Sequence, residues 1–386
     1  MNRFPRVAVA LAMLALFGSG GLLLWAESQL AVLSALAALI VLLTIGDRTS
    51  VGREASLACR QHPGFANGCA TIAVLLLLLY FREDHYTLLM IASVALYATA
   101  CAGLNLQMAF GGVVNFAGAA FFSIGAYAAG LLSARAGVPD LVAILGGGLV
   151  SAVLGIVTLL PVLRTKGNYT ALVTIAFGLM LRAFLEVNDA FGGPQGMKIG
   201  GFNLFGFAFN DVSTIGSWDV SFYLPYALLS LALFGFAFAL VRRIEFSWIG
   251  IAIDAVRSDD IAAAVFGLSI ARWKATAFII GNLLIGMAGA LFGMMNGFVT
   301  PNGAGLAESL VMLSIIVVGG LGNIWGGVAA AAIIVVTPQK LQAIQEYRLL
   351  IFAIVVVAIL RFRPSGMMPR PLRNLLRLSS RAGSTS

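Results

Sequence analysis

Two charged residues, Arg182 and Glu186, lie inside an apolar run that is long enough to cross a membrane. If this run is a helix, their spacing of four residues places both side chains on one face, where they can form an ion pair. Such an arginine could bind the carboxylate of a solute near the outer mouth of a transport path. Alternatively, the pair neutralises itself near the helix end, with both side chains reaching toward water. We favour the second interpretation and keep both residues as candidates for a translocation path.

Three asparagines, Asn105, Asn115 and Asn323, lie at membrane depth or at its edge. A buried amide needs hydrogen-bond partners, so each asparagine either lines a polar cavity or bonds the backbone of a broken helix. Both roles stay open, and all three are translocation-path candidates. Residues 111–118 and 319–326 share the pattern GGxxNxxG, which includes Asn115 and Asn323. This is either an internal repeat with matching helix breaks, as in many transporters, or chance similarity in a chain with 44 glycines.

The sequence contains no pattern of residues that is typical of an enzyme active site. The chain has no Walker A loop, no Ser-His-Asp candidate and no HExxH motif. We expect no metal site, because the cysteines and histidines lack ligand spacing; they are Cys59, Cys69, Cys101, His62 and His85. Charged residues are nearly absent from the apolar runs, although proton pumps and ion-coupled carriers usually need them there. We therefore expect a protein that is not an enzyme and binds no cofactor.

Residues 250–274 form the longest charged segment that is compatible with a helix. In a helix its apolar residues fall near one stripe, with Gly267 as the expected end. The stripe consists of Ile253, Val256, Ile261, Val265 and Leu268. Such an amphipathic helix between two spans either lies in the membrane interface or docks on a soluble partner.

Composition places the chain among membrane proteins. Of its 386 residues 60% are hydrophobic and only 10% are charged, whereas soluble domains carry about 25% charged residues. The apolar runs are continuous rather than alternating, which excludes a β-barrel and predicts an all-α polytopic protein with about 10–12 crossings. The expected spans are residues 7–25, 30–45, 65–81, 88–110, 116–132, 141–163, 169–187, 222–241 and 275–298, with about three more crossings in 306–360. Two of these last crossings are short and could be half-helices.

The first run could be a signal peptide, but its length and the second run that follows favour a retained span.

Small residues dominate the face that holds Gly118, Ala119, Ala120, Ser123, Gly125 and Ala126. They permit close helix packing, which we favour, or widen a path. We divide the chain into N-terminal spans and a loop of uncertain role (1–64), a transmembrane core (65–366) and a basic tail (367–386).

Lysine and arginine predict the orientation. With both termini in the cytoplasm, the outside retains only about five basic residues, Arg82, Arg135, Lys198, Lys340 and Arg348. Apart from Arg182 in a span, the remaining basic residues lie in the inner loops and the termini. The net charge of +8 then reflects this bias and not nucleic-acid binding. The segment 250–268 is expected inside, the long loop 188–221 outside, and the tail on anionic lipid headgroups.

Several motifs resemble one family. Residues 104–132, the glycine-rich loop 188–196, RSDDIAAAVFGL at 257–268, VVGGLGNIWGG at 317–327 and the ending RPSG at 363–366 are similar, in this order, to permease subunits of branched-chain amino acid ABC importers, the LivM type. The resemblance implies a type II-like importer permease in the bacterial inner membrane.

As partners, the resemblance implies a second permease subunit of the LivH type, two cytoplasmic ATPase subunits that bind the ATP, and a periplasmic solute-binding protein. The segment 250–268 would be the coupling helix that contacts the ATPase. The coupling role then falls on Asp259, Asp260, Ile261, Ala262, Ala263 and Gly267. Many ABC permeases begin this motif with Glu-Ala-Ala, but this chain has Ile261-Ala262-Ala263, so the acidic contact must come from Asp259 or Asp260.

Two alternatives to amino-acid import remain. Urea and short-amide permeases look alike in sequence, so a polar amide could be the substrate. A self-contained secondary transporter would need charged groups inside its spans or a carbonyl-lined filter, and the near absence of such charges argues against it.

Overall fold

The structure is a computed structural model, and it describes residues 18, 20–22, 24–25, 31, 34, 63–165, 169–204, 207–209, 213–215, 218–340, 347, 350, 357, 361 and 366–368. The expectations for the first two spans, for the loop that follows them, for the crossing after residue 340 and for the basic tail concern residues that lie almost entirely outside this part.

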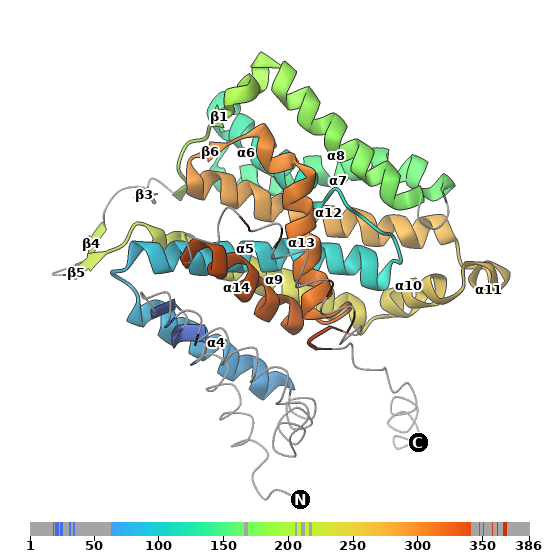
Figure 1. Ribbon diagram of the computed structural model, residues 1–386, viewed down its shortest axis with the longest axis horizontal. Coiled ribbons are helices and arrows are strands. Elements are labelled where there is room, and N and C mark those ends of the chain that lie inside the picture. Colours follow the sequence, from blue (N-terminus) through green and yellow to red (C-terminus); the bar gives the residue numbers. More distant parts are fainter. Residues whose placement is uncertain are drawn as a thin grey trace, which may run out of the picture.

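The described part is helical, with a few very short strands (Figure 1). Its helices are α4 (Pro63–Tyr80), α5 (His85–Asn105), α6 (Gly118–Ala136), α7 (Asp140–Arg164), α8 (Tyr169–Val187), α9 (Tyr223–Glu245), α10 (Trp248–Ser258), α11 (Asp260–Val265), α12 (Ile270–Asn296), α13 (Leu306–Gly319) and α14 (Ile324–Lys340). A π-helix, η1 (Leu106–Phe110), continues α5.

Five of these segments are long and apolar enough to cross a membrane: α5 with η1, α7, α8, α9 and α12. Shorter apolar helices lie within α4, α6, α13 and α14. The all-α polytopic class is therefore confirmed. Helix α8 has the same residues as the predicted span, because Thr165 ends α7 in an extended conformation and the apolar run resumes at Tyr169. Helix α13, at 14 residues, is as short as expected.

Helix α12 forms the centre of the bundle and packs against α5, α6 and α7. Close approach depends on glycines, because a Cβ at Gly125 of α6 would lie 2.0 Å from the Gly286 carbonyl oxygen of α12. One turn further along α12, a Cβ at Gly289 would lie 1.9 Å from the Phe122 carbonyl oxygen. The packing role expected for the small-residue face of α6 is confirmed, since Ala119 and Ala120 are also fully buried there.

The predicted loop 188–221 contains local structure that the sequence did not indicate. Its strand β1 (Met197–Lys198) pairs with β6 (Phe298–Val299) directly after α12. Two small hairpins follow, β2 (Asn203–Leu204) with β3 (Phe207–Ala208) and β4 (Ser213–Ile215) with β5 (Trp218–Val220).

Polar side chains of the bundle fix the middle of this loop, where the first hairpin begins. The backbone N–H of Asn203 donates to Asp140 Oδ2 of α7 at 2.6 Å, and the N–H of Phe202 donates to the Tyr226 hydroxyl of α9 at 2.8 Å. The hairpin of β4 and β5 lies at one end of the long axis, whereas α10 and α11 project from the other end (Figure 1).

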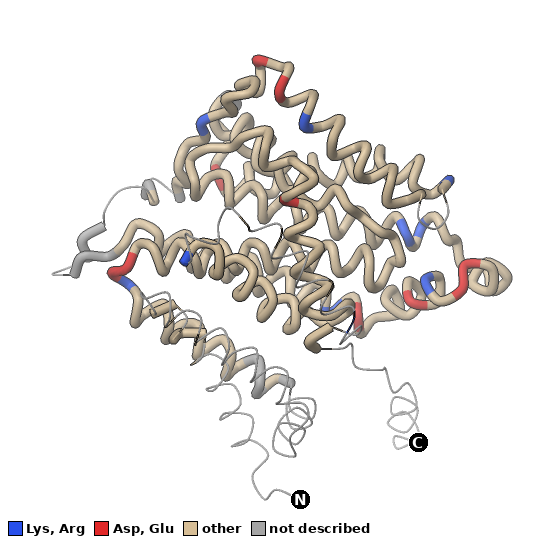
Figure 2. Tube along the Cα trace, viewed as in Figure 1, with Lys and Arg blue, Asp and Glu red and all other residues tan. Residues whose placement is uncertain are grey.

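Charged residues gather at the ends of the molecule. Figure 2 shows them on the turn before α5, at the outer end of α8 and on α10 and α11, while the helices between carry few. The turn before α5 is fixed by Asp84, whose carboxylate accepts from the N–H groups of Tyr86 and Thr87 and so caps the helix.

Candidate functional site

The segment from Trp248 to Val265 forms two helices, α10 and α11, where the sequence predicted one helix over residues 250–268. We call α10 and α11 together the arm. The single-helix prediction is wrong because Asp259 is extended, with φ −157° and ψ 107°, and its carboxylate accepts hydrogen bonds from the N–H groups of Ile261 and Ala262. Asp259 thereby starts a new helix, as an aspartate N-cap does.

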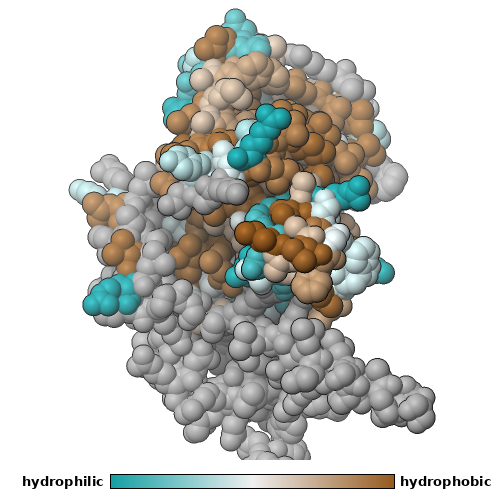
Figure 3. All heavy atoms as spheres, turned by 90° about the vertical axis from the view of Figure 1, so that its right-hand side faces the viewer, coloured by the Kyte–Doolittle hydropathy of each residue, from teal (hydrophilic) through white to brown (hydrophobic). Residues whose placement is uncertain are grey.

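The apolar stripe also divides at this break. Ile253 and Val256 of α10 are buried against the bundle, with exposed fractions of 2% and 1%. Ile261, Val265 and Phe266, which we call the tip, are exposed by 79%, 80% and 85%. Of the five predicted stripe residues, Ile253 and Val256 therefore anchor the arm, Ile261 and Val265 face away from the chain, and Leu268 is half-buried. Figure 3 faces this end, where apolar side chains stand beside polar ones on the projecting arm.

Asp260 does not project freely from the arm. One of its carboxylate oxygens accepts a hydrogen bond from Lys274 Nζ of α12 at 2.7 Å, in a pair that is part-buried. Both predicted acidic contacts are thus engaged within the chain, Asp259 as a cap and Asp260 as a brace between α11 and α12.

The other predicted residues of the arm differ in exposure. Ala262 is exposed beside Ile261, whereas Ala263 is buried, with an exposed fraction of 4%. Gly267 ends α11 at φ +81°, a left-handed conformation that favours glycine and lets the chain turn toward α12. The exposed surface of α11 is therefore apolar and small-residue in character.

The two GGxxNxxG motifs form matching helix breaks. In the first, Asn115 Oδ1 accepts from the N–H of Ala117 at 2.8 Å, directly before α6 begins. In the second, Asn323 Oδ1 accepts from the N–H of Trp325 at 3.1 Å, at the beginning of α14. Each motif follows the end of a helix and lets an asparagine start the next one, so the two share one local design.

One helix end holds both breaks. Asn105, the last residue of α5, accepts through Oδ1 from the N–H of Gly322 at 2.8 Å, so it fixes the second break. Gln107 of η1 accepts from Asn115 Nδ2 at 2.7 Å, so it fixes the first. Of the two roles open for the predicted asparagines, the structure places all three in hydrogen bonds that hold broken helices.

Gln107 also ties η1 to α12, because its Nε2 donates to the Phe278 carbonyl at 3.1 Å and to Asn282 Oδ1 at 2.8 Å. Gln107, Asn115 and Asn282 are all fully buried. Asn282 Nδ2 lacks a hydrogen-bond partner, and it lies against Gly155 of α7, where a Cβ would come within 2.3 Å.

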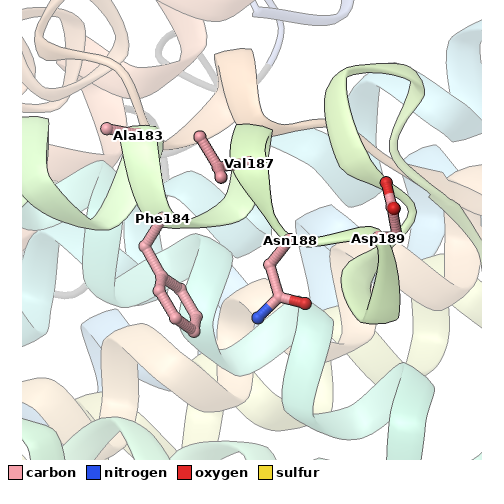
Figure 4. A pocket seen from close by; sticks show the side chains of 5 residues that line it. All are labelled: Ala183, Phe184, Val187, Asn188 and Asp189. Atoms are coloured by element: carbon pink, nitrogen blue, oxygen red, sulfur yellow. The ribbon is translucent and has the colours of Figure 1, made fainter.

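The predicted ion pair of α8 is present. Arg182 Nε donates to Glu186 Oε1 at 2.8 Å, and Arg182 Nη2 donates to Asn302 Oδ1 at 2.9 Å. These bonds tie α8 to the turn before α13, and both charged side chains remain about two-fifths exposed. Close to this pair, the end of α8 carries a shallow open pocket (Figure 4), which is lined by Ala183, Phe184, Val187, Asn188 and Asp189.

Sequence reasoning missed Phe266 of the tip, as well as Gln107, Asn282 and Arg257. Phe266 could have been found, because an aromatic residue beside the expected stop at Gly267 continues the apolar stripe. Gln107 and Asn282 meet across 175 residues, and no local pattern predicts such a contact. In the part of the chain that the structure describes, no group of three or more His, Cys, Asp or Glu side chains could hold a metal ion.

Comparison with known proteins identifies relatives of this chain. Residues 86–360 match the profile of a family described as branched-chain amino acid transport system / permease component. The chain is 34% identical over 281 residues to the high-affinity branched-chain amino acid transport system permease protein LivM of Salmonella typhimurium, across 69% of this chain and 66% of that protein. LivM of Escherichia coli gives the same identity and coverage.

Proteins named LivH are more distant. The high-affinity branched-chain amino acid transport system permease protein LivH of Salmonella typhimurium is 23% identical, across 76% of this chain and 97% of that protein. The match thus spans about two-thirds of the length of the LivM proteins and nearly all of this LivH protein. No solved structure matches the chain significantly. Because the family profile covers most of the chain, including the arm and both helix breaks, the chain belongs to the family of permease components of branched-chain amino acid transport systems.

Proposed function

We propose that this chain is a transmembrane permease subunit of an ABC importer that moves branched-chain or other hydrophobic amino acids inward. The named relatives are permease proteins of branched-chain amino acid transport systems, which supports this substrate class. ATP is hydrolysed by two partner subunits, a LivH-type permease completes the pore, and a periplasmic binding protein delivers the solute. The chain itself is then not an enzyme and needs no cofactor of its own.

The observation that carries the proposal is the exposed tip. Three large apolar side chains, Ile261, Val265 and Phe266, face away from the rest of the chain on an arm whose base is buried. Burying such a side chain contributes about 1.5–3 kcal/mol each, so the tip can supply much of the binding energy for a soluble partner. An ATPase groove that covers the tip would drive the arm when it closes on ATP.

Charge supports the orientation. Basic residues stand at the arm end of the bundle, among them Arg242 and Arg243 at the end of α9 and Arg272 at the start of α12. Lysine and arginine are retained on the cytoplasmic side of membrane proteins. We therefore place the arm and both termini in the cytoplasm and the strands of residues 197–220 in the periplasm, in a bacterial inner membrane.

The candidate path residues fall into two groups. Arg182 and Glu186 remain candidates for the outer part of the path, where their exposed portions can meet a zwitterionic solute. Asn105, Asn115 and Asn323 use hydrogen bonds on the helix breaks, so we assign them an indirect part in transport, through the shape of those breaks.

The experiment compares two variants of the arm in the complete transporter, reconstituted with both permeases, the ATPases and the binding protein. Phe266→Asp should lower ATP-dependent leucine uptake by more than about tenfold and release the ATPase on purification, because a buried aromatic anchor often dominates an interface. The matched control is Ser269→Asp, which adds the same charge at an exposed position outside the tip. It should leave uptake near the wild-type rate.

Three outcomes would contradict the proposal. Leucine uptake at the wild-type rate by the Phe266→Asp variant would show that the tip does not contact the ATPase. Leucine uptake by this chain alone in liposomes, without nucleotide, would favour a secondary transporter. Uptake of urea or a short amide, with leucine neither transported nor competing, would identify the chain as a urea or short-amide permease instead.

A further inference from the structure

The end of α5 departs from regular helix at the place where the arm touches the bundle. Residues Leu106–Phe110 form the π-helix η1, in which the N–H of Gly111 donates to the Leu106 carbonyl at 3.0 Å. A π-helix is rare and costs regular hydrogen bonding, and it occurs most often at functional positions.

The arm is docked on this π-helix by apolar contact. Ile253 of α10 belongs to a buried cluster that also contains Leu106, Ala109 and Phe110 of η1. The cluster also contains residues of α9 and α12, among them Val241 and Ala277, so α10 packs on these helices too. A displacement of α10 therefore acts directly on η1, as well as on α9 and α12.

A polar link joins the same two elements. Arg257 of α10 donates from its guanidinium to the Ala109 carbonyl of η1. The neighbouring Gly112 has φ +65°, and a Cβ there would lie 3.2 Å from Arg257 Cγ. Glycine at this position therefore lets the arginine side chain lie flat against the first helix break.

Gln107, which also belongs to η1, connects this π-helix to α12 and to the first helix break. Its side chain holds Asn115 of the first break and Asn282 of α12 in one buried set of hydrogen bonds. It fits only because Gly281 has no side chain, since a Cβ there would lie 2.6 Å from Gln107 Nε2. A continuous series of contacts thus runs from the arm through Arg257 and η1 to Gln107.

We propose that Arg257 and Gln107 are positioning residues for the transport cycle, and that η1 is the joint through which the arm moves the first helix break. This inference rests on the proposed function, because it needs an ATPase that moves the arm. In it, Arg257 transfers the displacement of α10 to the Ala109 carbonyl, and Gln107 transfers the displacement of η1 to Asn115, directly before α6.

The test measures leucine uptake and ATP hydrolysis together in the reconstituted complete transporter. Arg257→Ala should lower the ratio of leucine transported to ATP hydrolysed by about tenfold, a typical size for coupling between two sites, while the ATPase still co-purifies. Arg257→Lys should restore part of the ratio, since a lysine can still donate to the carbonyl. The matched control is Arg243→Ala, an exposed arginine of α9 near the same end, and its ratio should equal that of the wild type.

A second measurement does not depend on how well the variants fold. In the wild-type transporter, hydrogen exchange of residues 106–117 should differ between the nucleotide-free and the ATP-bound state. Two results would contradict the role of η1 as a joint without contradicting the proposed function. One is hydrogen exchange that is the same in both states, and the other is an Arg257→Ala ratio of leucine transported to ATP hydrolysed that equals the wild-type ratio. A wild-type complex without ATP-dependent uptake would overturn both.

Discussion

The side chain of Asn105 accepts a hydrogen bond from the backbone N–H of Gly322, 217 residues further along the chain, at 2.8 Å. Two residues after Asn105, Gln107 Oε1 accepts a hydrogen bond from the side-chain Nδ2 of Asn115 at 2.7 Å. The two GGxxNxxG breaks, which lie far apart in sequence, are therefore held by neighbouring residues at one helix end. A movement of this helix end must move both breaks together, whether or not the motifs share an ancestor.

Replacing Asn105 should destabilise the protein. Asn105→Ala leaves the buried N–H of Gly322 without an acceptor, and an unsatisfied buried donor costs about 1–3 kcal/mol. The free energy of unfolding, measured by denaturation in mixed micelles, should fall by that amount. The control is Asn296→Ala, because Asn296 is exposed and bonds only its own helix, and it should change stability by less than about 0.5 kcal/mol. Equal effects of the two variants would argue against a special role for the contact with Gly322.

The two break asparagines should respond differently to aspartate. Asn323 is partly exposed, and its Oδ1 accepts only from N–H groups at the start of α14. Asn323→Asp keeps that oxygen and adds negative charge at a helix N-terminus, so stability should stay equal or rise by about 0.3–1 kcal/mol.

Asn115→Asp should instead be strongly destabilising. It buries a charge and replaces the Nδ2 donor, so an oxygen faces Gln107 Oε1. Gln107 cannot turn its amide to compensate without losing its bonds to Asn282 and Phe278. We expect a loss of about 3–5 kcal/mol, as when a buried polar partner is removed. Thermal unfolding of both variants in the same detergent checks the contrast, and similar melting temperatures would contradict it.

The spans could be predicted from the sequence because membrane-length apolar runs determine them almost alone. Helix α8 was predicted to the residue, and the ion pair of Arg182 with Glu186 followed from spacing on one helix. The break at Asp259 was missed, although an aspartate followed by an apolar run is an N-cap signal. The apolar period continues across this aspartate, so periodicity concealed the break.

Contacts between distant segments could not be predicted. The π-helix η1 has no signature in composition, and the partners of Gln107 lie on α12 and in the first break. The sequence showed that buried asparagines need partners, but only the packing of α5 against α12 and α14 determines which partners they find. Ile253 is buried and Val265 is exposed, and this difference also depends on packing between segments that are distant in sequence.

The pair of Asp260 and Lys274 gives a test of how α11 is oriented. Their contact is 2.7 Å, and Asp260 is about half exposed while Lys274 is mostly covered. If Asp260 serves as a brace for α11, each of Asp260→Lys and Lys274→Asp should lower leucine uptake, and the double exchange should restore most of it. Restoration stays incomplete, because lysine at the first residue of α11 opposes the helix dipole by about 0.3–1 kcal/mol. Uptake that stays low in the double variant would instead indicate that Asp260 contacts the ATPase directly.

Glycine packing between α6 and α12 should be sensitive to a single methyl group. A Cβ at Gly125 would meet the Gly286 carbonyl oxygen at 2.0 Å, a distance that no side-chain adjustment can relieve because the atom belongs to the backbone. Gly125→Ala must separate the two helices, and overpacking of this kind costs about 1–3 kcal/mol. Gly235→Ala in α9 is the matched control, because a Cβ there meets no atom within 4 Å. It should be neutral or stabilise the protein by up to about 1 kcal/mol, since alanine is the better helix former. Unfolding of both variants in mixed micelles measures the difference, and a Gly125→Ala protein as stable as the wild type would contradict the close contact of α6 with α12.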